Sequence, residues 1–230
     1  MMPRTCLVCG TVLGGREKHL CLHCEAGLPL TYNWERAHNP MADAFNAALE
    51  RLRNEGEQME YAYASALLFY HHENPYKAIP QALKYGGNVK AGRHFASMMG
   101  RYMAAQPRFK DIDTVIPVPL HWARKWRRGY NQAEVIAAAI ACELDAKLCP
   151  NVLKRQKRTK SQTSLSAEER QKNVQGVFTA RNLPEGARHI LLVDDTFTTG
   201  ATLSACYYAV RKAAGPSVRI SVATLAVVED

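Results

Sequence analysis

Two kinds of hydrophobic pattern run along this chain, and they predict helices and strands in turn. A helix is expected at 41–54, where apolar residues recur at helical spacing. Further helices are expected at 75–85, which begins at a proline and ends at two glycines, at 88–103 after a candidate asparagine cap, at the alanine-rich 131–144, and at 202–213. Strands are expected where short apolar runs are bounded by polar or turn residues: 61–71, 114–119, 176–179, 190–193 and 218–228. Because strands and helices alternate from residue 114 onward, we expect an α/β domain with a mainly parallel sheet and flanking helices.

The first 25 residues lack both patterns and carry two Cys-x₂-Cys pairs instead. The pairs are separated by 11 residues and consist of Cys6, Cys9, Cys21 and Cys24. This spacing is typical of a tetrahedral zinc site, which stabilises a segment without a core by on the order of 10–16 kcal/mol. Four thiolates leave no open position, so the predicted zinc is structural. Thiols without a metal are the alternative, and His19 and His23 are competing candidate ligands.

Composition narrows the class of protein. With 230 residues, 47% hydrophobic and 22% charged, the chain suits one folded domain with a small appendage, and general disorder is excluded. No apolar run approaches the roughly 18 residues of a membrane span, and residues 1–10 lack the apolar core of a signal peptide. We therefore expect no membrane insertion and a cytoplasmic location, where cysteines are thiols or metal ligands.

The net charge of +9 comes from one region of the chain. Residues 84–172 contain 18 Lys and Arg against seven Asp and Glu, whereas the rest is slightly acidic. Because these cations are interleaved with apolar runs, they predict a folded surface that meets anions such as phosphates, nucleic acid or an acidic partner.

The most specific chemistry lies in residues 190–202. Four apolar residues predict a strand, Asp194 and Asp195 follow at its carboxyl end, and a Thr- and Gly-rich turn leads into a helix. Ligands of open α/β sheets bind at this edge, and a turn before a helix suits a phosphate dianion. The carboxylates suit hydroxyl groups or Mg²⁺. A ribose 5-phosphate offers both features, while a purely structural strand–turn–helix is the alternative.

This segment resembles the 13-residue signature of type I phosphoribosyltransferases. The resemblance implies that Asp194 and Asp195 contact the ribose 2- and 3-hydroxyls of phosphoribosyl pyrophosphate, which binds with Mg²⁺, and form the catalytic pair. It also implies a loop that holds the 5-phosphate, formed by Thr196, Phe197, Thr198, Thr199, Gly200, Ala201 and Thr202.

Residues 121–130 form a predicted basic loop. Its arginines are Arg124, Arg127 and Arg128. By the same resemblance the loop contacts pyrophosphate, which suits the bidentate hydrogen bonding of arginine. A solvated basic face is the alternative. The aromatic residues Trp122, Trp126 and Tyr130 lie among these cations, where they either stack nucleobases or pack the loop onto the domain.

A second basic loop is expected at residues 154–172. In type I phosphoribosyltransferases a long loop in this region closes over the site and excludes water. A flexible solvated loop is the alternative. Lys84 and Lys90 are candidates for further cations at the same mouth.

A pattern of four motifs covers nearly the whole chain. It consists of the cysteine pairs, the segment 117–121, the segment 128–132 and the phosphate motif at 190–202. It resembles the ComF family, also described as GntX-like, of bacterial competence and DNA-utilisation proteins with a type I phosphoribosyltransferase domain. The resemblance implies a role in DNA uptake, with competence proteins as candidate partners.

The expected organisation has two parts. A zinc module covers residues 1–30, and a phosphoribosyltransferase-like domain covers 31–230, with a hood at 31–110 and the core sheet at 111–230. Two functions stay open. The first is a phosphoribosyltransferase whose acceptor the sequence does not reveal. The second is a protein that binds single-stranded DNA or senses a metabolite with the same pocket, without turnover.

Overall fold

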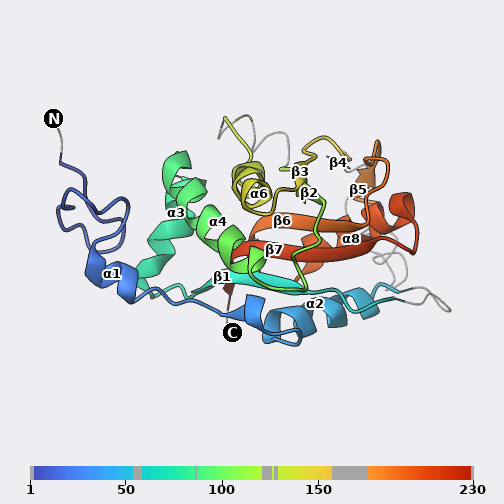
Figure 1. Cartoon of the computed structure of the whole chain (residues 1–230), viewed down its shortest axis with the longest axis horizontal. Coiled ribbons are helices and arrows are strands. Elements are labelled where there is room, and N and C mark those ends of the chain that lie inside the picture. The colour runs from blue at the N-terminus through green and yellow to red at the C-terminus, as the bar shows by residue number, and fades with distance from the viewer. Residues whose placement is uncertain are drawn as a thin grey trace, which may run out of the picture.

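The centre of the molecule is a five-stranded parallel sheet (Figure 1). The computed structural model describes residues 3–53, 59–85, 87–120, 126, 129–156 and 176–228. In order across the sheet, the strands are β1 (Ala64–Tyr70), β7 (Arg219–Val228), β6 (His189–Phe197), β2 (Thr114–Pro117) and β3 (Lys147–Leu148). A separate antiparallel pair consists of β4 (Leu153–Arg155) and β5 (Phe178–Ala180). The predicted α/β class with a mainly parallel sheet is confirmed.

Helices cover both faces of the sheet. One face packs against α2 (Pro40–Glu50) and α8 (Ala201–Ala214). The other packs against α3 (Ala78–Lys84), α4 (Val89–Ala104) and α6 (Gln132–Glu143). The short elements α1 (Leu22–Ala26), η1 (Asn33–Glu35) and η2 (Pro75–Lys77) lie in the connections. Burial on both faces explains why the central strands carry runs of consecutive apolar residues, such as 190–193 in β6.

Strand β6 shows this two-sided burial most clearly. Leu191 and Val193 belong to the core under α3, α4 and α6, while Ile190 and Leu192 belong to the core under α2 and α8. All four side chains are fully buried. Because successive side chains of a strand point to opposite faces, the strand places its next residues on the two faces in turn.

Three of the long helices begin at an asparagine cap. Asn39, Asn88 and Asn131 each accept a hydrogen bond from a backbone N–H in the first turn of α2, α4 and α6, at 2.9, 3.1 and 3.2 Å. The predicted cap at Asn88 is confirmed. Asn131 also donates from Nδ2 to the carbonyl of Val118 at 3.0 Å, which ties the start of α6 to the end of β2.

The structure corrects several expected element boundaries. Strand β6 runs to Phe197 rather than ending at residue 193, because residues 194–197 continue to pair with β7 up to Phe197 and Val227. The helix expected at 41–54 ends at Glu50. The structure also contains α1 and β3, which the hydrophobic pattern did not indicate because they are only five and two residues long.

The region between β3 and β6 also differs from expectation. Lys154 and Arg155, expected at the start of a loop, belong to β4 because they pair with Phe178 and Thr179 of β5. Residues 157–172 of the predicted loop lie outside the described residues. Strand β1 comes from the segment assigned to the hood and pairs with β7 in the central sheet. The division into domains stays a prediction.

The N-terminal segment packs beside α3 and α4 (Figure 1). Cys6, Leu20 and Cys24 are buried in the same apolar cluster as Phe95 of α4. The hydroxyl of Tyr76 donates to the carbonyl of Cys24 at 2.9 Å, which fixes α1 to η2. The segment therefore rests on the domain through both apolar and polar contacts. Among the described residues, no helix has the length and apolar character that crossing a membrane requires.

Candidate functional site

A cleft of about 240 Å³ opens at the carboxyl ends of β2 and β6. Its lining includes the acidic pair Asp194 and Asp195, the cations Lys84 and Arg155, and Thr202 from the first turn of α8. The N-terminus of α6 completes one wall. This is the edge of an open α/β sheet at which ligands bind.

The two aspartates face opposite sides of the sheet. Asp195 forms an ion pair with Lys84 at the end of α3, with Nζ and Oδ1 3.2 Å apart, and Lys84 also donates to the Thr196 hydroxyl at 2.9 Å. Asp194 lies toward α8, where its charge acts on Arg155 and on the Cys206 thiol. The backbone N–H of Asp195 donates to Oδ1 of Asp194 at 2.8 Å. The pair can therefore present oxygens to a ligand from both sides of the strand end.

Burial raises the pKa of Asp194 to about 7, and the neighbouring charge of Asp195 adds to this effect. The backbone N–H of Asp195 and the cations Lys84 and Arg155 act in the opposite direction. Ionisation of Asp194 beside Asp195 is therefore unfavourable in the site without a ligand. A cation or a pair of hydroxyl donors at this position would favour the ionised form.

The turn between β6 and α8 leaves the helix start open. Gly200 has a φ of +75°, and a Cβ there would meet the Phe197 ring at 3.1 Å, so both backbone geometry and space favour glycine. Among the described residues, no side chain caps α8, unlike α2, α4 and α6. Thr198 and Thr199, which precede the backbone N–H groups at the start of α8, are exposed. The N-terminus of α8 thus offers donors to an anion.

The structure brings together only part of the predicted site. Asp194, Asp195 and Thr202 line one cleft, and Thr196 contacts Lys84. Phe197 is 3% exposed and its ring packs against Phe45, so its side chain belongs to the core. The exposed residues of the turn and the first helical position are Thr198, Thr199 and Ala201. The predicted pyrophosphate contacts Arg124, Arg127 and Arg128 lie outside the described residues.

Three further residues of the cleft have weak or no signals in the sequence. Lys84 is only a candidate cation there, because its partner Asp195 lies 111 positions later in the chain. Arg155 lies in a segment that predicts a loop, whereas β4 and a cation–π contact with Phe178, at 5.5 Å from the ring centroid, hold it in place. Gln132 lines the cleft from the start of α6. The basic character of residue 155 was visible in the sequence, but its position was not.

Two aromatic residues of the predicted pyrophosphate loop are described. The hydroxyl of Tyr130 donates to the carbonyl of Leu83 in α3, which favours packing over base stacking at this position. Trp126, in contrast, is 89% exposed. Packing is therefore supported at Tyr130, while base stacking by Trp126 stays a prediction.

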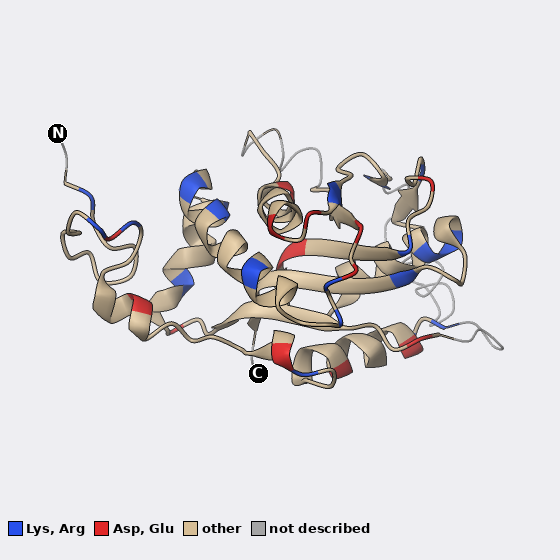
Figure 2. Cartoon of the chain, in the orientation of Figure 1, with Lys and Arg blue, Asp and Glu red and all other residues tan. Residues whose placement is uncertain are grey.

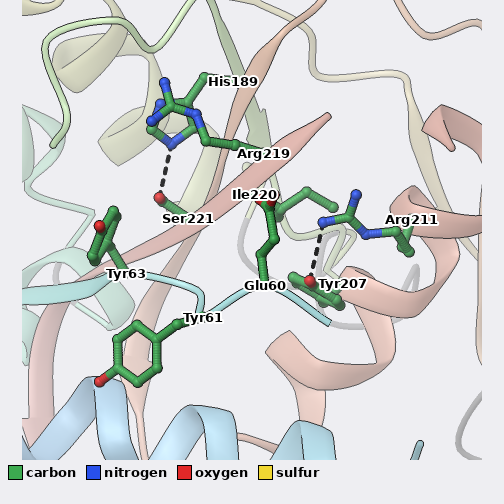
Figure 3. Close-up of a pocket in the computed structure, with 9 residues that line it drawn as sticks. All are labelled: Glu60, Tyr61, Tyr63, His189, Tyr207, Arg211, Arg219, Ile220 and Ser221. Atoms are coloured by element: carbon green, nitrogen blue, oxygen red, sulfur yellow. Dashed lines mark hydrogen bonds between the residues drawn. The ribbon is translucent and has the colours of Figure 1, made fainter. Parts of the chain in front are cut away.

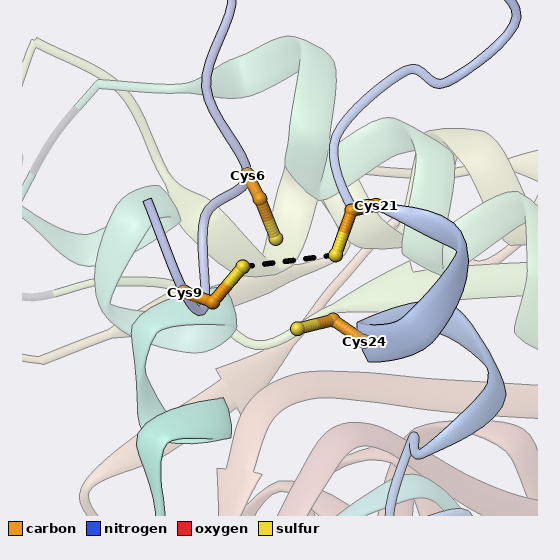
Figure 4. A group of neighbouring side chains, drawn as sticks. All are labelled: Cys6, Cys9, Cys21 and Cys24. Atoms are coloured by element: carbon orange, nitrogen blue, oxygen red, sulfur yellow. Dashed lines mark hydrogen bonds between the residues drawn. The ribbon is translucent and has the colours of Figure 1, made fainter. Parts of the chain in front are cut away.

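The four N-terminal cysteines form one cluster (Figure 4). Their sulfur atoms lie within 4.8 Å of one another, and those of Cys9 and Cys21 are 3.6 Å apart. Tetrahedral zinc with Zn–S bonds of about 2.3 Å places its sulfurs about 3.8 Å apart. The backbone also fits, because Gly10 has a φ of +75° and donates to the carbonyl of Cys6 at 3.0 Å. These cysteines could hold a metal such as zinc.

Among the described residues, neither candidate histidine joins the cysteine cluster. The ring of His19 lies 5.1 Å from that of His94, centroid to centroid, and so belongs to a different group of side chains. The cluster thus matches the set of four ligands expected from the spacing.

At the opposite edge of the sheet, β6 begins with a buried histidine (Figure 3). His189 Nε2 is 2.8 Å from the Ser221 hydroxyl, and its Nδ1 is 2.8 Å from an oxygen of Asp111. This order of groups is that of a nucleophilic triad. Ser221, however, is 1% exposed, and the adjoining cavity of about 20 Å³ has room for about one water. The cluster is therefore structural.

Fold and cleft define an α/β protein with a polar cleft at the carboxyl edge of its parallel sheet. No protein-family model matches the chain. The chain is 31% identical over 164 residues to Competence protein F of Haemophilus influenzae, covering 67% of this chain and 70% of that protein. This chain therefore belongs to the ComF-like family of competence and DNA-utilisation proteins, as the motifs implied.

Shorter matches agree with this assignment. DNA utilization protein YhgH of Escherichia coli K12 is 35% identical over 92 residues, 40% of either chain. Competence protein ComFC of Bacillus subtilis is 32% identical over 90 residues, which are 39% of this chain and 34% of that protein. Each of these two matches spans less than half of the relative.

Proposed function

We propose that the cleft at the carboxyl edge binds phosphoribosyl pyrophosphate or ribose 5-phosphate with Mg²⁺, in a protein that acts in the uptake or use of external DNA. One observation carries the ligand: a cleft of about 240 Å³ joins two carboxylates to the start of a helix that no described side chain caps. The names of the relatives, which refer to competence and DNA utilisation, support the cellular role.

Each part of the ligand has a suitable partner in this proposal. The 5-phosphate would accept hydrogen bonds from the backbone at the start of α8 and from the Thr198 and Thr199 hydroxyls. The ribose hydroxyls would donate to Asp194 and Asp195, whose oxygens are acceptors when ionised. The same carboxylates are suitable ligands for Mg²⁺, a hard cation that prefers oxygen. Lys84 would then turn from Asp195 toward the pyrophosphate.

Turnover would require displacement of pyrophosphate from C1 of the ribose. Bound Mg²⁺ would neutralise charge on the leaving group. The protein's part would be to fix the ribose between the acidic pair and the phosphate turn, so that C1 faces the open side of the cleft. Arg124, Arg127 and Arg128 are candidates to hold the departing pyrophosphate. The acceptor is not assigned.

The second function, binding of single-stranded DNA or sensing of a metabolite without turnover, has its own support. Trp126 is 89% exposed within a segment that carries four cations, a combination that suits stacked bases and phosphates. On this proposal, affinity for an oligonucleotide falls steeply with salt. Binding that is absent or independent of salt would contradict direct contact with DNA.

For the cysteine cluster, we propose a structural zinc ion. Its four thiolate ligands would leave no open position for a substrate, and two of them, Cys6 and Cys24, are buried against the domain. Metal analysis of the purified protein should give one zinc per chain, lost in a variant in which Cys9 and Cys21 are both serine. Full zinc content in that variant would contradict the assignment.

Isothermal titration tests the ligand directly. Phosphoribosyl pyrophosphate with Mg²⁺ should bind at one site, and the double variant Asp194→Asn/Asp195→Asn should weaken it at least about 100-fold, since two charge-assisted contacts are lost. The matched control Asp145→Asn/Glu185→Gln removes two exposed carboxylates elsewhere and should bind normally. Unchanged affinity in the first variant would exclude the cleft as the site. Release of pyrophosphate on addition of bases or DNA then separates an enzyme from a sensor.

A further inference from the structure

A second cavity, of about 230 Å³, lies between the N-terminal segment and α4. It shares no lining residue with the cleft at the carboxyl edge. The N-terminal segment contributes Arg16, Lys18, His19 and Glu25, and α4 contributes His94 and Phe95. None of these side chains belongs to the cysteine cluster or to the proposed ribose-phosphate site.

Three rings form one wall of this cavity. The centroids of His19 and His94 are 5.1 Å apart, those of His94 and Phe95 are 5.2 Å apart, and those of His19 and Phe95 are 6.4 Å apart. Phe95 is fully buried, while the two imidazoles are only partly covered. The planes of the two imidazoles are inclined by 50°, so a planar ring can stack on one of them and meet the other with its edge.

Basic side chains surround these rings. Arg16 and Lys18 are exposed, and within the described part of the chain neither takes part in a salt bridge. Burial holds the pKa of His94 below its ordinary value, and the charges of Lys18 and Arg101 add to this effect while Glu25 opposes it. Figure 2 shows Lys and Arg on the N-terminal segment and on α3 and α4. The lining of the cavity thus carries two cations, Arg16 and Lys18, against one carboxylate, Glu25.

We propose that this cavity binds a nucleotide, with its phosphate at Arg16 and Lys18 and its base against the imidazoles of His19 and His94. Cations interleaved with aromatic rings are the combination that binds phosphate and base together. Glu25 would accept a hydrogen bond from a base amino group or a sugar hydroxyl. The volume is slightly below that of ordinary small-molecule pockets, which suits a single nucleotide unit.

An acidic peptide fits the same lining less well. Its carboxylates would meet the cations, but a chain of acidic residues offers no planar ring for the imidazoles. A nucleotide uses all three kinds of side chain. The unit can be a free nucleotide or one residue of a single strand, since the two share the same phosphate and base. This inference does not depend on the proposed function of the cleft.

The test uses the full chain with its metal, in the background Asp194→Asn/Asp195→Asn, so that the cleft does not contribute. Thymidine 5′-monophosphate and a (dT)₁₂ oligonucleotide are titrated, with thymidine and inorganic phosphate as reference probes. Arg16→Gln/Lys18→Gln removes the two cations, and Lys147→Gln/Lys212→Gln removes two exposed cations elsewhere. The removal of the cavity's cations should weaken binding roughly 10- to 100-fold, and the control pair should change it less than threefold.

A third variant, His94→Ala, separates stacking from charge. It should weaken binding of the monophosphate and leave that of inorganic phosphate unchanged. Binding of the monophosphate alone would identify a free nucleotide, and binding of the oligonucleotide alone would identify a strand. Equal affinity of the cavity variant and the control for every probe would overturn the proposal. It would also be overturned if inorganic phosphate bound as tightly as the monophosphate.

Discussion

The two ends of strand β6 both carry ionisable groups, yet they are arranged in opposite ways. At the amino end, His189 has a partner on each ring nitrogen, Ser221 and Asp111, and the adjoining cavity measures about 20 Å³. At the carboxyl end, Asp194 and Asp195 lie side by side in a cleft of about 240 Å³. The amino end satisfies its polar groups, whereas the carboxyl end keeps like charges together beside open space.

The pKa shifts follow the same division. Burial lowers the pKa of His189 to about 4, so the ring is neutral and serves hydrogen bonding. Burial and Asp195 raise the pKa of Asp194 to about 7, so its charge is held against its surroundings. Perturbed carboxylates in a cleft are typical of functional sites, while a perturbed group without access to ligand is typical of structure. Access distinguishes the two ends better than the shift itself.

The largest effect on stability is expected at the amino end. His189→Ala leaves the Ser221 hydroxyl and an oxygen of Asp111 without their partner and opens a cavity, so the free energy of unfolding should fall by about 2–4 kcal/mol. Affinity for phosphoribosyl pyrophosphate should stay within twofold. Urea unfolding and titration measure the two quantities. Normal stability with lost affinity would reverse the roles of the two ends.

Asp194→Asn should raise the free energy of unfolding, whereas His189→Ala lowers it. Because folding raises the pKa of Asp194 above its ordinary value, the folded state gains stability at low pH and loses it as the pH rises from about 4 through 7. The variant avoids this loss, so without ligand or Mg²⁺ it should be more stable than the wild type by roughly 1–3 kcal/mol at pH 8. The two should converge below pH 4. A variant less stable at pH 8 would contradict the shift.

His189→Gln tests the pKa shift at the amino end through the pH dependence of the free energy of unfolding. Folding lowers the pKa of His189 from 6.5 to about 4, so the unfolded chain binds the proton more readily and the wild type loses stability as the pH falls through this window. The variant should lose about 2–3 kcal/mol less between pH 7 and pH 4. The exposed His71→Gln is the control for loss of an imidazole outside this cluster. Equal slopes in the wild type and His189→Gln would show that His189 does not titrate as described.

The smallest effect is expected for Lys84→Gln. Its ion pair with Asp195 is partly exposed, at 23% and 20% of the two side chains, so unfolding should change by less than about 1 kcal/mol. Affinity for phosphoribosyl pyrophosphate should fall roughly fivefold and that for ribose 5-phosphate less, because only the former carries pyrophosphate. The reference is Lys212→Gln, at an exposed lysine in the last turn of α8. An equal loss of affinity for both ligands would contradict a contact between Lys84 and the pyrophosphate.

Motifs that are local in the sequence could be recognised without the structure, whereas contacts between distant segments could not. The four cysteines and the sequence from Asp194 to Thr202 are contiguous or regularly spaced, so they could be named as candidate ligand residues without a fold. The ion pair of Lys84 with Asp195 and the approach of Arg155 to Asp194 depend on the sheet order and on β4, which the pattern did not indicate. The cluster at the amino end also depends on the sheet order. Ser221 belongs to β7, which pairs with β6 and so brings the hydroxyl to His189.

The most direct test of the central claim is a crystal structure of the protein grown with phosphoribosyl pyrophosphate and Mg²⁺. The expected result is the 5-phosphate at the start of α8, within hydrogen-bond distance of the Thr198–Thr202 turn, and the ribose hydroxyls or the metal at Asp194 and Asp195. A ligand bound elsewhere, with the acidic pair and the turn free of it, would contradict the assignment of the carboxyl edge as the functional end of β6.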